Sequence, residues 1–245
     1  MSAPRPDQLI VVIGTGTDVG KTWVAAAALQ ALRQQGLTVA ARKPAQSFGP
    51  DDPHTDADVL GAATGEAPTS VCPRHRWYEV PMAPPMAAEV LGRPPFTIRD
   101  LIAETVWPDK IDLGLVESAG GVRSPLAADD DGDAVTLMAA LMPEVVVLVA
   151  DAELGTINSI RLTMTAIEPL TTTRDDLDLI VVLNRFDVEN ELHRRNDAWL
   201  RDHDGLNVMT SIDQLTAAII AGAAGRDQKA AGLDQKEGAA RHKQP

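Results

Sequence analysis

The chain of 245 residues is long enough for one large domain with its own hydrophobic core. Its composition, 44% hydrophobic and 23% charged residues, is typical of a globular protein and excludes disordered, collagen-like and coiled-coil chains. Lys and Arg number 22 against 35 Asp and Glu, which gives a net charge of −13, so neither nucleic acid nor an anionic membrane surface is expected as a partner.

The first segments along the chain predict a strand, a helix and a second strand. Residues 9–14 (LIVVIG) form a continuous apolar run that ends in glycine, which is typical of a strand buried on both faces. Residues 21–35 are rich in alanine and have apolar side chains at helical spacing, and residues 37–42 (LTVAAR) indicate another strand. This order predicts a right-handed parallel crossover.

The same alternation continues through most of the chain. Further strands are predicted at residues 112–117, 145–150, 177–183 and 206–209, and further helices at 158–170, 188–201 and 211–221. Strands that alternate with helices predict an α/β fold, with a doubly wound, mostly parallel sheet flanked by helices. Residues 48–53 and the proline-rich residues 68–95 are expected to be irregular.

The strongest motif lies between the first strand and the first helix, at residues 14–22 (GTGTDVGKT). Glycines allow a tight turn in which several backbone N–H groups point at one anion, and the helix N-terminus adds its positive end. Lys21 supplies a charge to the outer phosphates and the Thr22 hydroxyl is placed to bind Mg²⁺. Five residues, rather than the usual four, separate Gly14 from Gly20. The motif predicts a nucleoside triphosphate site in a P-loop fold.

Carboxylates and a second lysine follow other predicted strands. Glu117 ends a buried strand, at the edge where α/β sheets bind ligands, and Lys43 follows the second strand at the same edge. Asp56 and Asp58 precede a predicted helix, and either can supply a second carboxylate for Mg²⁺ or act as a first-turn acid that favours the helix dipole.

Four motifs in this order resemble the dethiobiotin synthetase family. They are the extended loop at residues 14–22, the Lys-Pro-x-x-Ser pattern at 43–47, VESAGG at 116–121, and the Leu-Gly-x-Ile-Asn pattern at 154–158. Within the family, glycine is usual where Ser118 stands, and an aspartate is common where Arg185 stands. A divergent P-loop ligase and a partition-type ATPase are the alternatives. The latter class carries an extra lysine where this chain has Gly16.

The resemblance implies an ATP-dependent ligase of biotin biosynthesis. Its substrates would be the diamino acid 7,8-diaminononanoate, CO₂ or bicarbonate, and ATP, with Mg²⁺, and its product dethiobiotin would form through a carbamate and a carbamic-phosphoric anhydride. The resemblance also implies a homodimer in which the helix start at Asn158 binds the substrate carboxylate across the interface. The proline-rich residues 81–86 occupy the place of a substrate loop.

Site residues carry over from the family by position. Catalytic groups would be Thr17, Lys21, Lys43 and Ser47, and metal ligands would be Thr22, Asp56 and Glu117. ATP would be bound by Gly14, Thr15, Gly16, Thr17, Asp18, Val19, Gly20, Lys21, Thr22 and Asn184, the last of these recognising the base. The diamino acid would be bound by Ser47, Gly155, Thr156, Ile157 and Asn158.

The remaining expectations concern the ends of the chain and its location. We expect one P-loop α/β domain over residues 1–221 and a disordered polar tail over residues 222–245. A single cysteine, Cys72, forms no intramolecular disulfide, the N-terminus lacks the layout of a signal peptide, and no apolar run approaches the roughly 20 residues that cross a bilayer. These features predict a cytoplasmic protein.

Overall fold

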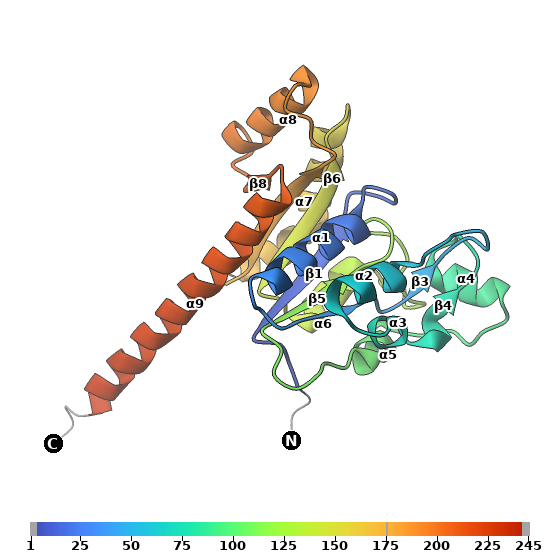
Figure 1. Cartoon of the computed structure of the whole chain (residues 1–245), viewed down its shortest axis with the longest axis horizontal. Coiled ribbons are helices and arrows are strands. Elements are labelled where there is room, and N and C mark those ends of the chain that lie inside the picture. Colours follow the sequence, from blue (N-terminus) through green and yellow to red (C-terminus); the bar gives the residue numbers. More distant parts are fainter. Residues whose placement is uncertain (1–3, 175, 242–245) are drawn as a thin grey trace.

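A six-stranded parallel sheet forms the centre of the molecule (Figure 1). The computed structural model describes residues 4–174 and 176–241 of the chain. The strand order is β2-β5-β1-β6-β7-β8, and every neighbouring pair is parallel. The strands are β1 (Gln8–Gly14), β2 (Val39–Arg42), β5 (Leu113–Glu117), β6 (Val145–Asp151), β7 (Asp178–Asn184) and β8 (Val208–Met209). The predicted fold class is therefore confirmed.

Helices cover both faces of this sheet, because successive side chains of each strand point to opposite sides. Leu9, Val11 and Ile13 of β1 pack into one core with residues of α5, α6 and α7, and the alternate residues Ile10 and Val12 pack into the other with α1, α2 and α9. The helices of these layers are α1 (Lys21–Gln34), α2 (Asp56–Thr64), α5 (Ile98–Glu104), α6 (Ala134–Leu141), α7 (Thr156–Thr173), α8 (Glu191–Asp202) and α9 (Ile212–Arg241).

β1 stands at the topological switch point of the sheet. From β1 the chain leads by way of α1 to β2 on one side, while β6, β7 and β8 extend the sheet on the other. Ligands of open α/β sheets bind outside the carboxyl ends of the strands at such a point. The loop at residues 14–22 begins where β1 ends, so the topology places it at the centre of that edge.

The proline-rich segment at residues 68–95 is more regular than its composition predicts. It contains α3 (Pro68–Val71), a 3-10 helix (Arg74–Arg76), the short strand β4 (Trp77–Tyr78) and α4 (Pro84–Val90). Pro68 and Pro84 each begin a helix, where the missing N–H costs nothing and the fixed φ suits the helix. β4 pairs with β3 (Gln46–Ser47) in a second, two-stranded parallel sheet. The expectation of an irregular segment is wrong here.

The last helix extends well beyond the segment predicted for it. Residues 222–241 continue α9 as a helix (Figure 1), where the composition predicted a disordered tail. The last four residues of that predicted tail, 242–245, lie outside the described residues. The division of the chain at residue 221 stays a prediction. No helix among the described residues combines the length and the apolar composition that crossing a membrane requires.

Gly114 allows β5 to pack closely against the N-terminal segment, and this predicts a stability effect. A Cβ at this position would overlap the ring of Pro6 and lie 2.7 Å from the indole of Trp107. Gly114→Ala should therefore lower the free energy of unfolding in urea by about 1–3 kcal/mol through overpacking. The matched control is Gly225→Ala on α9, where a Cβ meets nothing within 4 Å. Alanine favours a helix there, so a comparable loss in both variants would contradict the explanation.

Candidate active site

The conformation of the phosphate-binding loop, at the junction of β1 and α1, is fixed by Gly20 and by a bond from Lys21. Gly20 caps α1 with φ at 92°, a conformation that side chains disfavour. The Lys21 ammonium is buried and donates to the carbonyl of Gly16 at 2.9 Å, so it folds back over the loop. Burial, aided by the positive charge of Lys43, lowers the pKa of Lys21 to about 8. An anion gathered by this loop would favour the charged form of Lys21.

A cluster of charges lies beside the loop, with the Lys43 ammonium at its centre. Its Nζ is 2.6 Å from Oε1 of Glu117 and 2.8 Å from Oδ2 of Asp56. The Thr22 hydroxyl is 2.8 Å from the same Glu117 oxygen and 2.9 Å from Oδ1 of Asp56. Lys43 and Glu117 are buried, with 2% and 0% of their surface exposed. Four side chains from separate segments are therefore joined by hydrogen bonds and ion pairs in one cluster.

The electrostatics of this cluster follow from burial and mutual attraction. Burial alone would lower the pKa of Lys43, but Asp56 and Glu117 outweigh it and raise that pKa above its ordinary value. Burial opposes ionisation of Asp56, but Lys43 and the Thr22 hydroxyl hold the Asp56 pKa below its usual range. Burial raises the pKa of Glu117, and the Lys43 ammonium opposes that rise. Lys43 is therefore firmly a cation at neutral pH.

Local structure decides which of the two predicted aspartates joins the cluster. Thr55 caps α2, and Asp58 completes a capping box: its carboxylate accepts from the Thr55 backbone N–H at 2.8 Å. Asp56, the first residue of α2, points the other way and binds Lys43. Asp56 is thus the carboxylate of the site, and Asp58 serves the helix terminus.

A cavity of about 810 Å³ opens above the loop and the charge cluster. Its walls include all of the predicted catalytic and metal-binding residues: Thr17, Lys21, Thr22, Lys43, Ser47, Asp56 and Glu117. The Ser47 hydroxyl, at the end of β3, is buried and has no hydrogen-bond partner among the described residues. Pro81 and Pro84, from the predicted substrate loop, line the same cavity. The structure thus brings these predicted groups together around one space.

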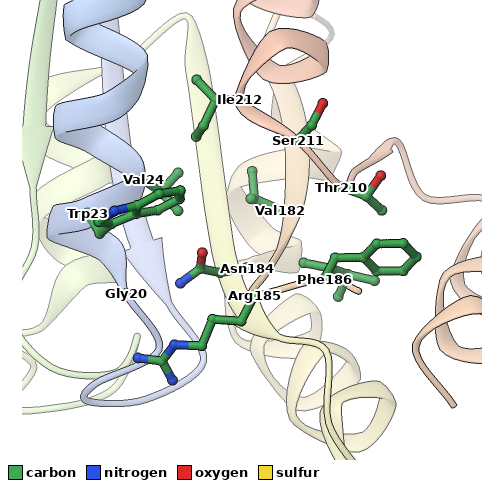
Figure 2. A pocket seen from close by; sticks show the side chains of 11 residues that line it. Gly20, Trp23, Val24, Val182, Asn184, Arg185, Phe186, Thr210, Ser211 and Ile212 are labelled. Atoms are coloured by element: carbon green, nitrogen blue, oxygen red, sulfur yellow. The ribbon is translucent and has the colours of Figure 1, made fainter. Parts of the chain in front are cut away.

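A second cavity of about 440 Å³ lies beside Gly20 of the loop, between α1 and the end of β7 (Figure 2). Asn184, the last residue of β7, lines it, and its amide Nδ2 donates to the Val19 carbonyl at 2.9 Å. A Cβ at Gly20 would overlap that amide. Apolar walls come from Val24, Val182 and Ile212. Within the part of the chain that the structure describes, the Asn184 side-chain carbonyl oxygen accepts no hydrogen bond, so it can accept one from an amino group of a base.

Other predicted residues stand apart from these cavities. Gly155, with φ at 100°, caps α7, and Thr156 donates to the Asp151 carbonyl at 2.7 Å. Gly155, Thr156, Ile157 and Asn158 line neither cavity within one chain. Ser118 avoids the left-handed region, which Gly120 adopts instead with φ at 69°, so the backbone at this position does not require the glycine that the family usually has.

Two cavity residues were given no functional role by the sequence analysis, although it noted Arg185 as a departure from the family. Trp23, on the first turn of α1, is 60% exposed, and Arg185 follows β7 in the left-handed conformation with φ at 58°. Both line both cavities. The sequence signal that could have identified Trp23 is its position directly after the Lys-Thr pair of the loop. The structure shows that its side chain is not packed in the core.

The residues present fit a magnesium ion. Two carboxylates and one hydroxyl, from Asp56, Glu117 and Thr22, offer oxygen atoms beside the phosphate loop. Oε2 of Glu117 is buried, and no described residue forms a hydrogen bond with it. Among the described residues no group of three or more His, Cys, Asp and Glu side chains gathers to hold a metal. A site with one or two carboxylates suits Mg²⁺, which takes its other ligands from phosphates and water.

The buried charge cluster predicts a strong coupling between Lys43 and Glu117. Lys43→Met leaves two carboxylates without their cation and should lower the free energy of unfolding by about 3–5 kcal/mol. Adding Glu117→Gln to this variant should restore at least about 1 kcal/mol of the free energy of unfolding. A double-mutant cycle measured by urea unfolding gives this coupling. Arg195→Met, which breaks the exposed pair with Glu191, is the control and should cost less than about 1 kcal/mol. Additive effects of the two cluster substitutions would contradict the coupling.

Comparison with known proteins places this geometry in a family. An AAA domain family matches residues 8–219. The ATP-dependent dethiobiotin synthetase BioD of Caulobacter vibrioides is 41% identical over 186 residues, which are 73% of this chain and 80% of that protein. The protein of the same name from Haloferax mediterranei is 36% identical over 203 residues, 81% of each chain.

A solved structure of a plasmid partition protein from Borrelia burgdorferi covers 89% of this chain and 99% of its own, with a TM-score of 0.53 and 12% identity. That likeness shows the shared fold alone. The match over residues 8–219 and the identity to the two synthetases show more: the chain belongs to the AAA domain family and to the family of ATP-dependent dethiobiotin synthetases.

Proposed function

We propose that this protein is an ATP-dependent cyclo-ligase that converts 7,8-diaminononanoate and CO₂ to dethiobiotin in biotin biosynthesis. The observation that carries the proposal is the meeting of Lys21, Thr22, Lys43 and Glu117 in one cavity. The names of the relatives support the same activity. A partition-type ATPase is not favoured, because the related structure of that class supports only a common fold.

The reaction consists of two group transfers. One amine of the substrate captures CO₂ and loses a proton, which gives a carbamate. A carbamate oxygen attacks the γ-phosphorus of ATP and ADP leaves, so that a carbamic-phosphoric anhydride forms. The second amine attacks the anhydride carbonyl and loses a proton, inorganic phosphate leaves, and the cyclic urea of dethiobiotin closes. Such phosphoryl transfer depends on positioning and charge neutralisation more than on covalent chemistry by the protein.

The cavity residues suit these needs. Lys21 would bind the transferred phosphoryl group, and Lys43 would stabilise the negative charge that develops on the carbamate and phosphoryl oxygens. Thr17 lines the cavity, and the unpartnered hydroxyl of Ser47 is available to hold the substrate. When Mg²⁺ is bound by Thr22, Asp56 and Glu117, it neutralises charge on the phosphate oxygens.

The substrate carboxylate would be bound outside the cavity of a single chain. Gly155 to Asn158 begin α7, whose N-terminal backbone N–H groups suit an anion. Leu154 and Leu162 beside them are 87% and 65% exposed, and burying such side chains against a second copy would be favourable. These observations support a homodimer whose partner contributes the α7 start. A cytoplasmic location accords with the buried free thiol of Cys72.

The activity is tested by product formation. Purified protein with diaminononanoate, bicarbonate, ATP and Mg²⁺ should yield dethiobiotin, detected by mass spectrometry. Lys21→Ala should reduce turnover by at least about a thousandfold, because the transferred phosphoryl group loses its main cation. Its thermal unfolding temperature should stay close to that of the unchanged protein. Protein that binds ATP but forms no dethiobiotin would instead support a divergent ligase.

The homodimer is tested by light scattering at several concentrations. A mass of two chains is expected at micromolar protein. Leu154→Asp and Leu162→Asp together should shift the mass toward one chain, since each buries a charge in the interface. A mass of one chain that does not change with concentration would refute the dimer.

A further inference from the structure

The two cavities beside the phosphate loop share lining residues, and the space beside these shared residues is called the passage below. Gly20, Trp23 and Arg185 are the residues that line both of them. The cavity with Lys21 and Thr22 is polar, and the other has apolar walls around Asn184. A nucleotide that spans both would place its outer phosphates in the first and its base in the second. Its ribose and the α-phosphate would then lie in the passage, between Trp23 and Arg185.

The Arg185 side chain is directed at this passage rather than at the base. It extends from the end of β7 toward the loop that carries Gly20, on the other side of Asn184 from Ile212 (Figure 2). Its Nη2 donates to the backbone carbonyl of Asp18 at 3.1 Å. That bond fixes the guanidinium beside the loop and uses one of its five N–H donors.

The charge of Arg185 is available to a ligand. Among the side chains that the structure describes, those of residues 4–174 and 176–226, no carboxylate lies within ion-pair distance of its guanidinium. The chain has a net charge of −13, and Arg185 adds a positive charge to the lining of both cavities. A guanidinium binds phosphate oxygens through two parallel N–H bonds. The ligand chemistry that matches is therefore a phosphate monoester or diester.

We propose that Arg185 binds the α-phosphate of the nucleotide, while Trp23 covers the opposite side of the passage. The inference rests on the proposed function only in taking the ligand to be a nucleoside triphosphate. Arg185 then adds affinity for nucleotides in general, because the α-phosphate is common to all of them. Selection of the base is left to Asn184 and the walls of the second cavity.

The test compares AMP with adenosine, which differ by this phosphate. Each displaces a fluorescent ATP analogue from the full-length protein. AMP should bind about tenfold more tightly than adenosine, as expected for a charge-assisted contact. Arg185→Asn should reduce that ratio to about one and leave adenosine binding unchanged. Asparagine is chosen because it tolerates the left-handed conformation of this position. Arg185→Lys, which keeps the charge, should retain part of the ratio.

Two further variants separate a direct contact from an indirect one. Arg194→Asn is the matched control, since Arg194 also bonds a backbone carbonyl, that of Val188, but lines neither cavity. It should keep the full ratio. Lys21→Ala should weaken ATP but not AMP. If Arg185 acts only by holding the Asp18 carbonyl, Arg185→Asn will weaken the binding of ATP but not that of AMP, as Lys21→Ala does. That result would overturn the inference.

Three other results would also overturn the inference. They are AMP that binds no better than adenosine to the unchanged protein, an unchanged ratio in Arg185→Asn, and a loss of adenosine binding in that variant. The titration involves no turnover. A protein that forms no dethiobiotin but shows the expected ratios would therefore refute the proposed function and leave the assignment of Arg185 standing.

Discussion

The ion pairs of Lys43 with Glu117 and Asp56 are the interaction on which the site depends. Burying a carboxylate such as Glu117, with none of its surface exposed, is costly unless a cation and hydrogen bonds compensate it. Lys43 and the Thr22 hydroxyl supply that compensation at 2.6 and 2.8 Å. Since the partners come from β5, from the segment after β2 and from α1, the same bonds that neutralise the charge also fix three segments relative to one another.

The order of strands makes this cluster possible. β5 lies between β1 and β2, and all three run parallel. Their carboxyl ends therefore open on one edge, where the residues that follow each strand are neighbours although they are far apart in sequence. The phosphate loop follows β1, Lys43 follows β2, and Glu117 ends β5. The residues of this cluster come from neighbouring segments and bond to one another, so its geometry can be rigid before a ligand binds.

Much of this arrangement could be predicted from the sequence, because it depends on local signals. Apolar runs identified the long strands, and the glycines with Lys21 identified the loop. The residue pattern alone left the choice between Asp56 and Asp58 open. Thr55 followed three residues later by Asp58 is the pattern of a capping box. Recognising it in the sequence would have assigned Asp58 to the helix terminus and Asp56 to the site. The regular structure at residues 68–95 was missed because Pro68 and Pro84 were taken as breakers rather than as first residues of helices.

The passage between the cavities could not be predicted, because it depends on a contact between segments about 165 positions apart. Asn184 binds the Val19 carbonyl and Arg185 the Asp18 carbonyl, so the end of β7 holds the loop from the side opposite Lys43. Asp18 and Arg185 both adopt the left-handed conformation, which is uncommon for a non-glycine residue other than Asn and Asp. Gly20 has no Cβ to keep Asn184 away. The loop is thus fixed between β7 and the charge cluster, and a nucleotide would meet backbone N–H groups already in place rather than pay to order them.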